Sequence, residues 1–178
     1  ATALGEYAGT LKICILLYAY LISTLLYPAH LNNNTFIPKE YTQGLIFYQG
    51  AKVDEKAYAP MIREIANNNI LCVIAKAPFN FAIFDVDAAE DIIDEFDDKK
   101  IDWYISGHSL GGSMASMYAY DNKDEIKGVI LFASYSTKDI SDFNVLSIYG
   151  TNDKILNLEK YNETKEKRYY EGGAHFKY

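Results

Sequence analysis

Short apolar runs alternate with amphipathic stretches along the chain from residue 45 onward. The apolar runs are 4 to 6 residues long, which is the length of strands rather than of helices. Alternation of this kind is typical of βαβ units around a mostly parallel sheet, with both faces covered by helices. The runs predicted as strands cover residues 45–48, 70–75, 101–106, 129–133, 145–149 and 167–170.

Three stretches between these runs predict helices, at residues 55–67, 87–98 and 110–120. The first two place apolar residues near one face at helical spacing, with polar and acidic residues on the other face. The third is small and apolar, which suits a helix packed closely against a sheet. The inward residues expected for the first two helices are Tyr58, Met61, Ile62, Ile65, Ala66, Ile92, Ile93 and Phe96.

The segment 13–27 is almost entirely apolar and follows Lys12. A spanning helix needs about 20 apolar residues, and this run is shorter and contains polar Ser23 and Thr24. A membrane anchor and a buried helix or strand pair both remain open. We expect residues 1–44 to form an N-terminal segment and lead-in, as an anchor or as the first strands or helix. Residues 45–178 then form the core of a single domain, and its location is open between membrane-associated or extracytoplasmic and cytoplasmic.

Composition narrows the classes of partner. At 178 residues the chain is long enough for one domain, and its net charge of −7 disfavours nucleic acid and anionic lipid surfaces. Its two cysteines, Cys14 and Cys72, each lie in an apolar run and are expected to be structural thiols. They make no disulfide framework and no CxxC pair, so no metal site is expected. Oligomeric state is not determined by these features.

The most informative motif is Gly107-His108-Ser109-Leu110-Gly111-Gly112, which has the form GxSxG between a predicted strand and a predicted helix. A sharp strand-to-helix turn of this kind holds the serine in a strained conformation that projects its hydroxyl. The flanking glycines are needed because side chains there would clash. Ser109 is therefore the predicted nucleophile, and the Leu110 amide at the helix N-terminus is a predicted oxyanion donor.

A serine nucleophile needs a base that takes its proton, and the chain contains three histidines. His108 adjoins the serine and is expected to project away from it, and His30 lies upstream of the core. His175 follows the last predicted strand in the loop Glu171-Gly172-Gly173-Ala174-His175, from which it can return to the carboxyl edge of the sheet. His175 is therefore the predicted base.

The third member of such a triad is a carboxylate that lies between serine and histidine in chain order and follows a strand. Asp153 meets both conditions, because it follows the run 145–149 in the loop Gly150-Thr151-Asn152-Asp153. Its predicted role is to orient the imidazole and to stabilise the imidazolium. Asp139 and Asp142 are the alternatives.

A second oxyanion donor is expected in the loop after the first core strand, Tyr48-Gln49-Gly50-Ala51-Lys52. Gly50 permits close approach of the backbone, so the predicted donor is an amide of Gly50 or Ala51. Phe79, Phe81 and Tyr135 fall in predicted loops and are interpreted as lining for an apolar acyl pocket.

The three segments GHSLGG, GTNDKI and GGAHF, each after a predicted strand, resemble those of the α/β-hydrolase superfamily. Within it the chain is most similar to compact bacterial hydrolases related to dienelactone hydrolase and to small carboxylesterases. The resemblance implies an α/β-hydrolase fold and an acyl-enzyme mechanism without metal or organic cofactor. The connection from residue 133 to residue 145 is too short for a cap domain. The chain ends three residues after His175, so the usual C-terminal helix is absent and the sequence is consistent with a trimmed protein.

These patterns predict a serine hydrolase that cleaves a small carboxylic ester or a similar acyl bond of a small-molecule substrate. Two alternatives stay open. An acyltransferase uses the same triad with an acceptor other than water, and a catalytically silent α/β-hydrolase module binds a ligand without chemistry.

Overall fold

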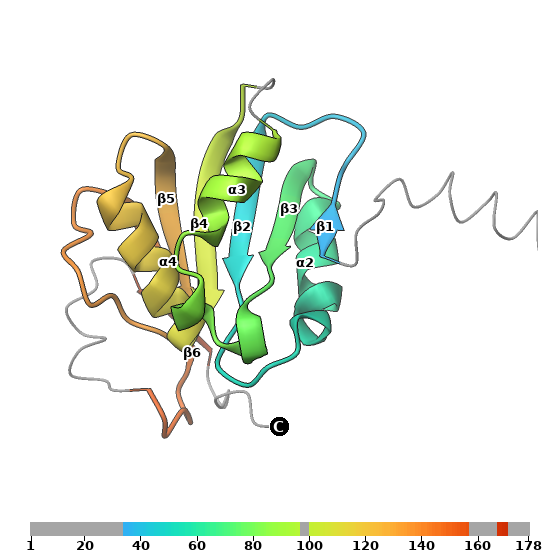
Figure 1. Cartoon of the computed structure of the whole chain (residues 1–178). Coiled ribbons are helices and arrows are strands. Elements are labelled where there is room, and N and C mark those ends of the chain that lie inside the picture. The colour runs from blue at the N-terminus through green and yellow to red at the C-terminus, as the bar shows by residue number, and fades with distance from the viewer. Residues whose placement is uncertain (1–33, 97–99, 157–166, 171–178) are drawn as a thin grey trace, which may run out of the picture.

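The structure is a computed structural model that describes residues 34–96, 100–156 and 167–170. Its centre is a twisted sheet of seven described strands in the order β1-β3-β2-β4-β5-β6-β7 (Figure 1). β1 pairs antiparallel with β3, and every other neighbouring pair is parallel. The strands are β1 (Thr35–Phe36), β2 (Gln43–Tyr48), β3 (Ile70–Ala75), β4 (Asp102–His108), β5 (Ile126–Phe132), β6 (Asn144–Gly150) and β7 (Lys167–Tyr170).

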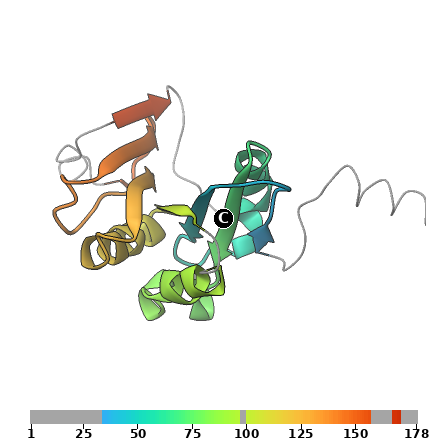
Figure 2. The same cartoon turned by 90° about the horizontal axis from the view of Figure 1, so that it is seen from above.

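The sheet separates two helical layers (Figure 2). α3 (Ala88–Glu95) and α4 (Leu110–Asp121) cover one face, and α2 (Ala59–Ala66) covers the other. Side chains of a strand alternate between these faces. In β2, Ile46 and Tyr48 therefore pack toward α3 and α4, whereas Phe47 packs toward α2. Because helices cover both faces of the sheet, the strands have nearly continuous apolar sequences.

The prediction of a single helix over residues 55–67 is wrong in one respect, because the structure contains two helices there. A 3₁₀ helix, η1 (Glu55–Tyr58), precedes α2, and Pro60 lies in the first turn of α2. Proline has no amide hydrogen, so it fits the first turn of a helix but not its interior. The break leaves Tyr58 at the junction of the two helices. α2 ends at the asparagines, and Asn69 has a φ of 62°.

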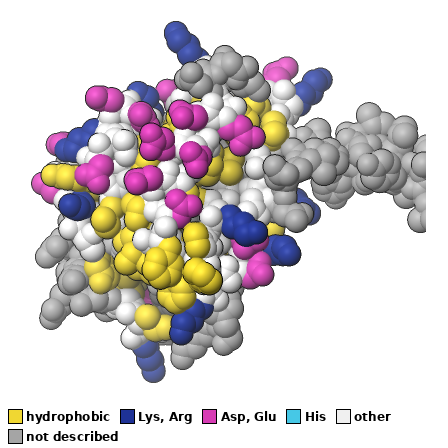
Figure 3. All heavy atoms as spheres, viewed as in Figure 1, with side chains coloured by type: hydrophobic (Ala, Val, Ile, Leu, Met, Phe, Trp, Pro, Cys, Tyr) yellow, Lys and Arg dark blue, Asp and Glu magenta, His cyan; other side chains and the backbone are white. Residues whose placement is uncertain are grey.

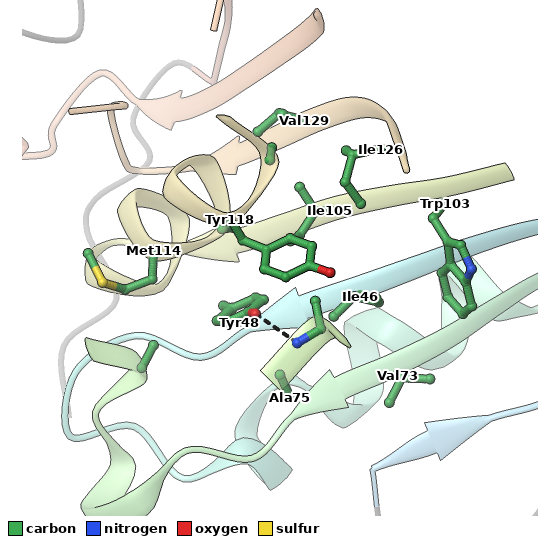
Figure 4. Close-up of a cluster of buried hydrophobic side chains, with 14 of the residues drawn as sticks. Ile46, Tyr48, Val73, Ala75, Trp103, Ile105, Met114, Tyr118, Ile126 and Val129 are labelled. Atoms are coloured by element: carbon green, nitrogen blue, oxygen red, sulfur yellow. Dashed lines mark hydrogen bonds between the residues drawn. The ribbon is translucent and has the colours of Figure 1, made fainter. Parts of the chain in front are cut away.

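The main core cluster lies between the sheet and the two helices α3 and α4 (Figure 4). The rings of Tyr48 from β2 and Tyr118 from α4 both point into it, beside Ile105 of β4. The Tyr48 hydroxyl donates to the Val86 carbonyl at 2.5 Å and accepts from the Ala89 amide at 3.0 Å. Burial raises the pKa of this phenol well above its usual value. The bonds attach the start of α3 to the sheet.

The predicted strands are all present in the structure, with ends that differ by up to three residues. Their alternation with helices agrees with the predicted mostly parallel sheet. β1 lies in the region predicted as a lead-in and extends the sheet beyond β3. The segment 133–143 between β5 and β6 contains turns and bends. Among the described residues no helix has the length and apolar character to cross a membrane. Residues 13–27 lie outside the described residues, so their predicted role as an anchor or as buried elements stays a prediction.

Candidate active site

The site lies at the carboxyl edge of the sheet, between β2 and β4. From β2 the chain adds its next strand on one side, and from β4 it adds strands on the other side. β2 connects through α2 to β3 on one side, and β4 connects through α4 to β5 on the other side. In an open parallel sheet, ligands bind in the crevice at the carboxyl ends of such strands. The loop 49–53 follows β2, and Ser109 follows β4, so the two meet at this point of the sheet.

Ser109 has the backbone conformation expected of a nucleophile at a sharp turn. Its φ is 52° and its ψ is −122°, between the end of β4 and the start of α4. A residue with a β-carbon enters this region rarely and at a cost of about 1–3 kcal/mol. Strain of this kind is a reason to infer function, because the surrounding structure must maintain it.

Glycines beside Ser109 allow the turn to pack. A β-carbon on Gly107 would lie 2.4 Å from the Gly111 carbonyl carbon, and one on Gly111 would lie 2.3 Å from the Gln49 carbonyl oxygen. Both obstacles are backbone atoms, which cannot swing away as a flexible side chain does. The glycines therefore let β4, the start of α4 and the loop after β2 come into direct contact.

The end of β5 holds the same turn from the other side. The Ser109 amide donates to the Phe132 carbonyl at 2.9 Å, and the buried Ser134 hydroxyl donates to the Ser109 carbonyl at 2.6 Å. A β-carbon on Gly112 would lie 2.6 Å from Ser134 Oγ. Ser134 therefore fixes the strained peptide, a role that the sequence analysis missed. The available signal was a serine two residues after the end of β5.

The loop after β2 is fixed at several amides. The Gly50 amide donates to Tyr58 Oη at 3.0 Å, and the Lys52 amide donates to the Asn80 carbonyl at 2.8 Å. The Val53 amide donates to the Gly50 carbonyl at 3.2 Å. The Gly50 amide, one of the predicted oxyanion donors, therefore already has an acceptor in Tyr58 Oη. Of the four amides in residues 50–53, only that of Ala51 has no acceptor among the described residues.

The segment after β3 braces this loop through Asn80. Gln49 is fully buried, and its Nε2 donates to Asn80 Oδ1 at 3.2 Å. Asn80 has a φ of 59°, which asparagine tolerates better than most residues. The sequence analysis did not single out Asn80, because an asparagine in a loop ordinarily indicates only a turn.

Asp153 lies in the turn after β6, as its place in the chain predicted. It is 7% exposed, and its Oδ1 accepts hydrogen bonds from the amides of Ile155 and Leu156 at 2.8 and 2.9 Å. These amides orient the carboxylate. The two alternatives are both exposed: Asp139 accepts from the Ser141 amide, and Asp142 pairs with Lys123 at 3.2 Å. Hydrogen bonds from Ser141 lower the pKa of the Asp139 carboxyl.

Two of the three histidines, His175 and His30, lie outside the described residues, so the predicted base stays a prediction. His108 is 6% exposed and lies on the α2 side of the sheet. Its Nδ1 is 2.8 Å from Tyr58 Oη, and the two rings are 5.8 Å apart between centroids. Tyr58 was predicted as an inward residue of a helix, and its contact with the loop after β2 was not anticipated.

The aromatic residues predicted to line a pocket lie on loops, but with different surroundings. Phe79 is 87% exposed, so it belongs to an open surface rather than to the wall of an enclosed pocket. Phe81 is half-buried, and its ring centroid is 6.0 Å from that of Phe84. Tyr135 is also half-buried, and its carbonyl accepts from Ser113 Oγ at 2.9 Å.

An apolar surface forms beside the turn at Ser109, with Phe79, Ile83 and Phe84 as its exposed residues. Figure 3 shows apolar side chains gathered on this part of the molecule, with acidic side chains above them. The 3₁₀ helix η3 (Ala82–Phe84) packs against α4, and Asn80 bonds to the loop after β2. The surface is thus continuous with the residues around Ser109.

No group of histidine, cysteine, aspartate and glutamate side chains in the described part of the chain is arranged to hold a metal ion. Cys72 is fully buried in β3, and burial raises the pKa of its thiol to about 12. A thiol of this kind is not a nucleophile at neutral pH. Ser109 lies at a strained turn, with the Leu110 amide next to it in sequence and the loop that carries Ala51 packed against Gly111.

The chain was compared with protein families, with curated sequences and with solved structures. The sequence pattern described as the alpha/beta hydrolase family matches residues 44–175. The structure is similar to TT1662 from Thermus thermophilus, at 14% identity and a TM-score of 0.63, with 80% of this chain and 85% of that chain covered. The comparison with curated protein sequences finds no match.

Two further structures are similar in fold at low sequence identity. Est1E from Butyrivibrio proteoclasticus with bound ferulic acid is 14% identical, with a TM-score of 0.64 and coverage of 79% of this chain and 85% of that chain. A structure from a study of carboxylesterases of Nitrososphaera gargenis is 12% identical, with a TM-score of 0.64 and the same coverages of 79% and 85%. At these identities the likeness concerns the fold.

Proposed function

The chain belongs to the alpha/beta hydrolase family, and we propose that it is a serine hydrolase that cleaves carboxylic esters of small molecules through an acyl-enzyme intermediate. Ser109 is the nucleophile, His175 is the base and Asp153 orients the base. Leu110 and Ala51 supply the amides that bind the oxyanion. No metal ion or organic cofactor takes part in the proposed reaction.

The observation that carries this proposal is the backbone of Ser109. A φ of 52° with a ψ of −122° is costly for serine, and bonds from Phe132 and Ser134 together with three glycines maintain it. A turn that needed only to connect a strand to a helix would be cheaper with glycine at this position. The presence of serine at so strained a position supports a role for its hydroxyl.

The proposed reaction proceeds in two steps. His175 takes the Ser109 proton as the oxygen attacks the ester carbonyl, and the developing oxyanion accepts hydrogen bonds from the two amides. The imidazolium then protonates the alcohol that leaves. In the second step His175 takes a proton from water as the water attacks the acyl-enzyme, and the imidazolium then returns this proton to the Ser109 oxygen as the acid leaves. Asp153 is suited to its part because backbone amides already hold its carboxylate.

The exposed apolar surface favours esters with an apolar acyl group. Phe79, Ile83 and Phe84 are all more than half exposed, and they adjoin the loop that carries Ala51. An octanoyl chain that covers such side chains gains about 1–2 kcal/mol over an acetyl group, which is roughly 10-fold in kcat/KM. Ferulic acid, which is bound to Est1E, is an aromatic carboxylic acid, and this is consistent with an apolar acyl group.

Labelling with a fluorophosphonate tests the nucleophile. Mass spectrometry of the full chain is expected to find the adduct on Ser109, and hydrolysis of p-nitrophenyl esters is expected to vanish in Ser109→Ala with an unchanged circular dichroism spectrum. An unlabelled Ser109 in folded protein, or full activity in Ser109→Ala, refutes the proposal.

A series of acyl lengths tests the substrate preference. Phe84→Ser is expected to lower kcat/KM for the octanoate by about 10-fold and to leave the acetate within about 2-fold. Tyr120→Ser is the matched control, because Tyr120 is an exposed aromatic residue near the other end of α4. Equal losses for both esters, or the same loss in the control, would contradict the acyl assignment.

A further inference from the structure

A buried hydrogen-bonded chain connects the turn at Ser109 to the loop after β2 on the α2 side of the sheet. Tyr58 Oη lies at its centre, 3.0 Å from the Gly50 amide nitrogen and 2.8 Å from His108 Nδ1. Tyr58 and His108 are 5% and 6% exposed, and Gly50 is buried as well. These three residues come from η1, β4 and the loop after β2, which are separated in sequence.

The hydrogen bond between Gly50 and Tyr58 has a fixed direction. An amide only donates, so the Gly50 N–H donates to Tyr58 Oη, and the phenol keeps its own proton for another acceptor. When His108 Nδ1 is unprotonated, the phenol donates to it. His108 directly precedes Ser109, so one tyrosine hydroxyl links the predicted nucleophile's strand to the predicted oxyanion loop.

Gly50 also packs closely on this pair. A β-carbon on Gly50 would lie 2.6 Å from His108 Nδ1 and 3.0 Å from Tyr58 Oη. The ring of Tyr58 is in turn held by Phe47, at 4.7 Å between ring centroids. The loop therefore rests directly on polar atoms with fixed positions, whereas its other side is bonded to Asn80.

These contacts decide which amide of the loop remains for catalysis. Gly50, Lys52 and Val53 have acceptors for their amides, and Ala51 has none among the described residues. A hydrogen bond at Gly50 constrains the orientation of the following peptide plane, because the two share the Gly50 α-carbon. An oxyanion donor is effective only when it is held in place before the reaction.

We propose that Tyr58, held by His108, is a positioning residue that fixes the loop so that the Ala51 amide binds the oxyanion. This inference rests on the proposed hydrolase function and adds a residue to it. Because the oxyanion forms only in the transition state, loss of the positioning contact should lower kcat and leave KM nearly unchanged.

Tyr58→Phe removes the hydroxyl and keeps the ring against Phe47. We expect kcat for p-nitrophenyl acetate to fall by about 10- to 100-fold, less than the loss of about 10²- to 10³-fold typical when an oxyanion donor is removed outright. The inhibition constant of a trifluoromethyl ketone, which forms an oxyanion on the serine, should rise by the same factor. Tyr118→Phe is the control, because it removes a phenol that bonds to Glu125 away from the loop.

The partner residue gives an independent test. His108→Asn keeps a polar atom near the place of Nδ1 and should retain more kcat than His108→Leu, which removes it. The losses of Tyr58→Phe and His108→Leu should not add in the double variant, since both break one contact.

The outcomes separate this inference from the proposed function. If wild-type Ser109 reacts with fluorophosphonate and Tyr58→Phe keeps the kcat of Tyr118→Phe, the positioning role is overturned and the hydrolase remains. If wild-type Ser109 does not react, both fall. Should Tyr58→Phe not fold, equal kcat in folded His108→Asn and His108→Leu overturns the inference.

Discussion

Replacing Ser109 by glycine is expected to make the protein more stable while it removes the nucleophile. The φ of 52° and ψ of −122° at this position are unfavourable for a residue with a β-carbon and accessible to glycine. Ser109 is only half-buried, so truncation of its side chain removes little packing. The backbone bonds of the turn, to Phe132 and Ser134, do not depend on the side chain.

The expected gain follows from two opposing contributions to the free energy of unfolding. Relief of backbone strain contributes about 1–3 kcal/mol. The greater freedom of glycine in the unfolded chain offsets about 0.5–1 kcal/mol of this. The net stabilisation is about 1 kcal/mol, which raises the Tm of a domain of this size by about 2–4 °C. Ser109→Ala keeps the β-carbon, and therefore the strain, so it should gain nothing by this route.

Urea unfolding of wild type, Ser109→Gly and Ser109→Ala at one pH measures the difference directly. Both variants should lack esterase activity, and only the glycine variant should have a higher free energy of unfolding with the same m-value. The alanine variant controls for loss of the hydroxyl. If Ser109→Gly is no more stable than Ser109→Ala, the turn stores no strain and the main argument for a retained nucleophile fails.

Three further results are expected. Gly111→Ala places a β-carbon against the Gln49 carbonyl and should cost about 2 kcal/mol or more of stability, measured by urea unfolding; a loss below about 0.5 kcal/mol would contradict the close packing. Asp153→Asn should lower kcat about 10³- to 10⁴-fold with little change in the circular dichroism spectrum, and near-normal turnover would remove it from the site. In a Cys14→Ser background, Cys72 should resist iodoacetamide at pH 8 until urea unfolds the chain, because burial raises its thiol pKa to about 12; rapid labelling of the native protein would contradict this.

Much of the fold could be predicted because its signals are local. An apolar run of strand length or an amphipathic stretch of helical period is a property of neighbouring residues. The predicted elements agree with the structure to within about three residues at their ends, apart from the division at Pro60, the added strand β1 and the 3₁₀ turns at 78–80 and 82–84. The family match bears out the predicted α/β-hydrolase fold. The turn at Ser109 was also predictable, since its motif is six consecutive residues and the contact that requires glycine at position 107 is with Gly111 of the same motif.

The sequence by itself determined the alternation of strands and helices, the strand-to-helix turn with its serine, and the chain order of the predicted acid and base. Only the tertiary structure decided that the Gly50 amide is used by Tyr58, that Ser134 and Asn80 brace the two loops, and that Phe79 lies in the open. The physical reason is the range of the interactions involved. Periodicity and turn propensity act between residues a few positions apart, whereas the partner of a buried amide or hydroxyl depends on which distant segments the folded sheet brings together.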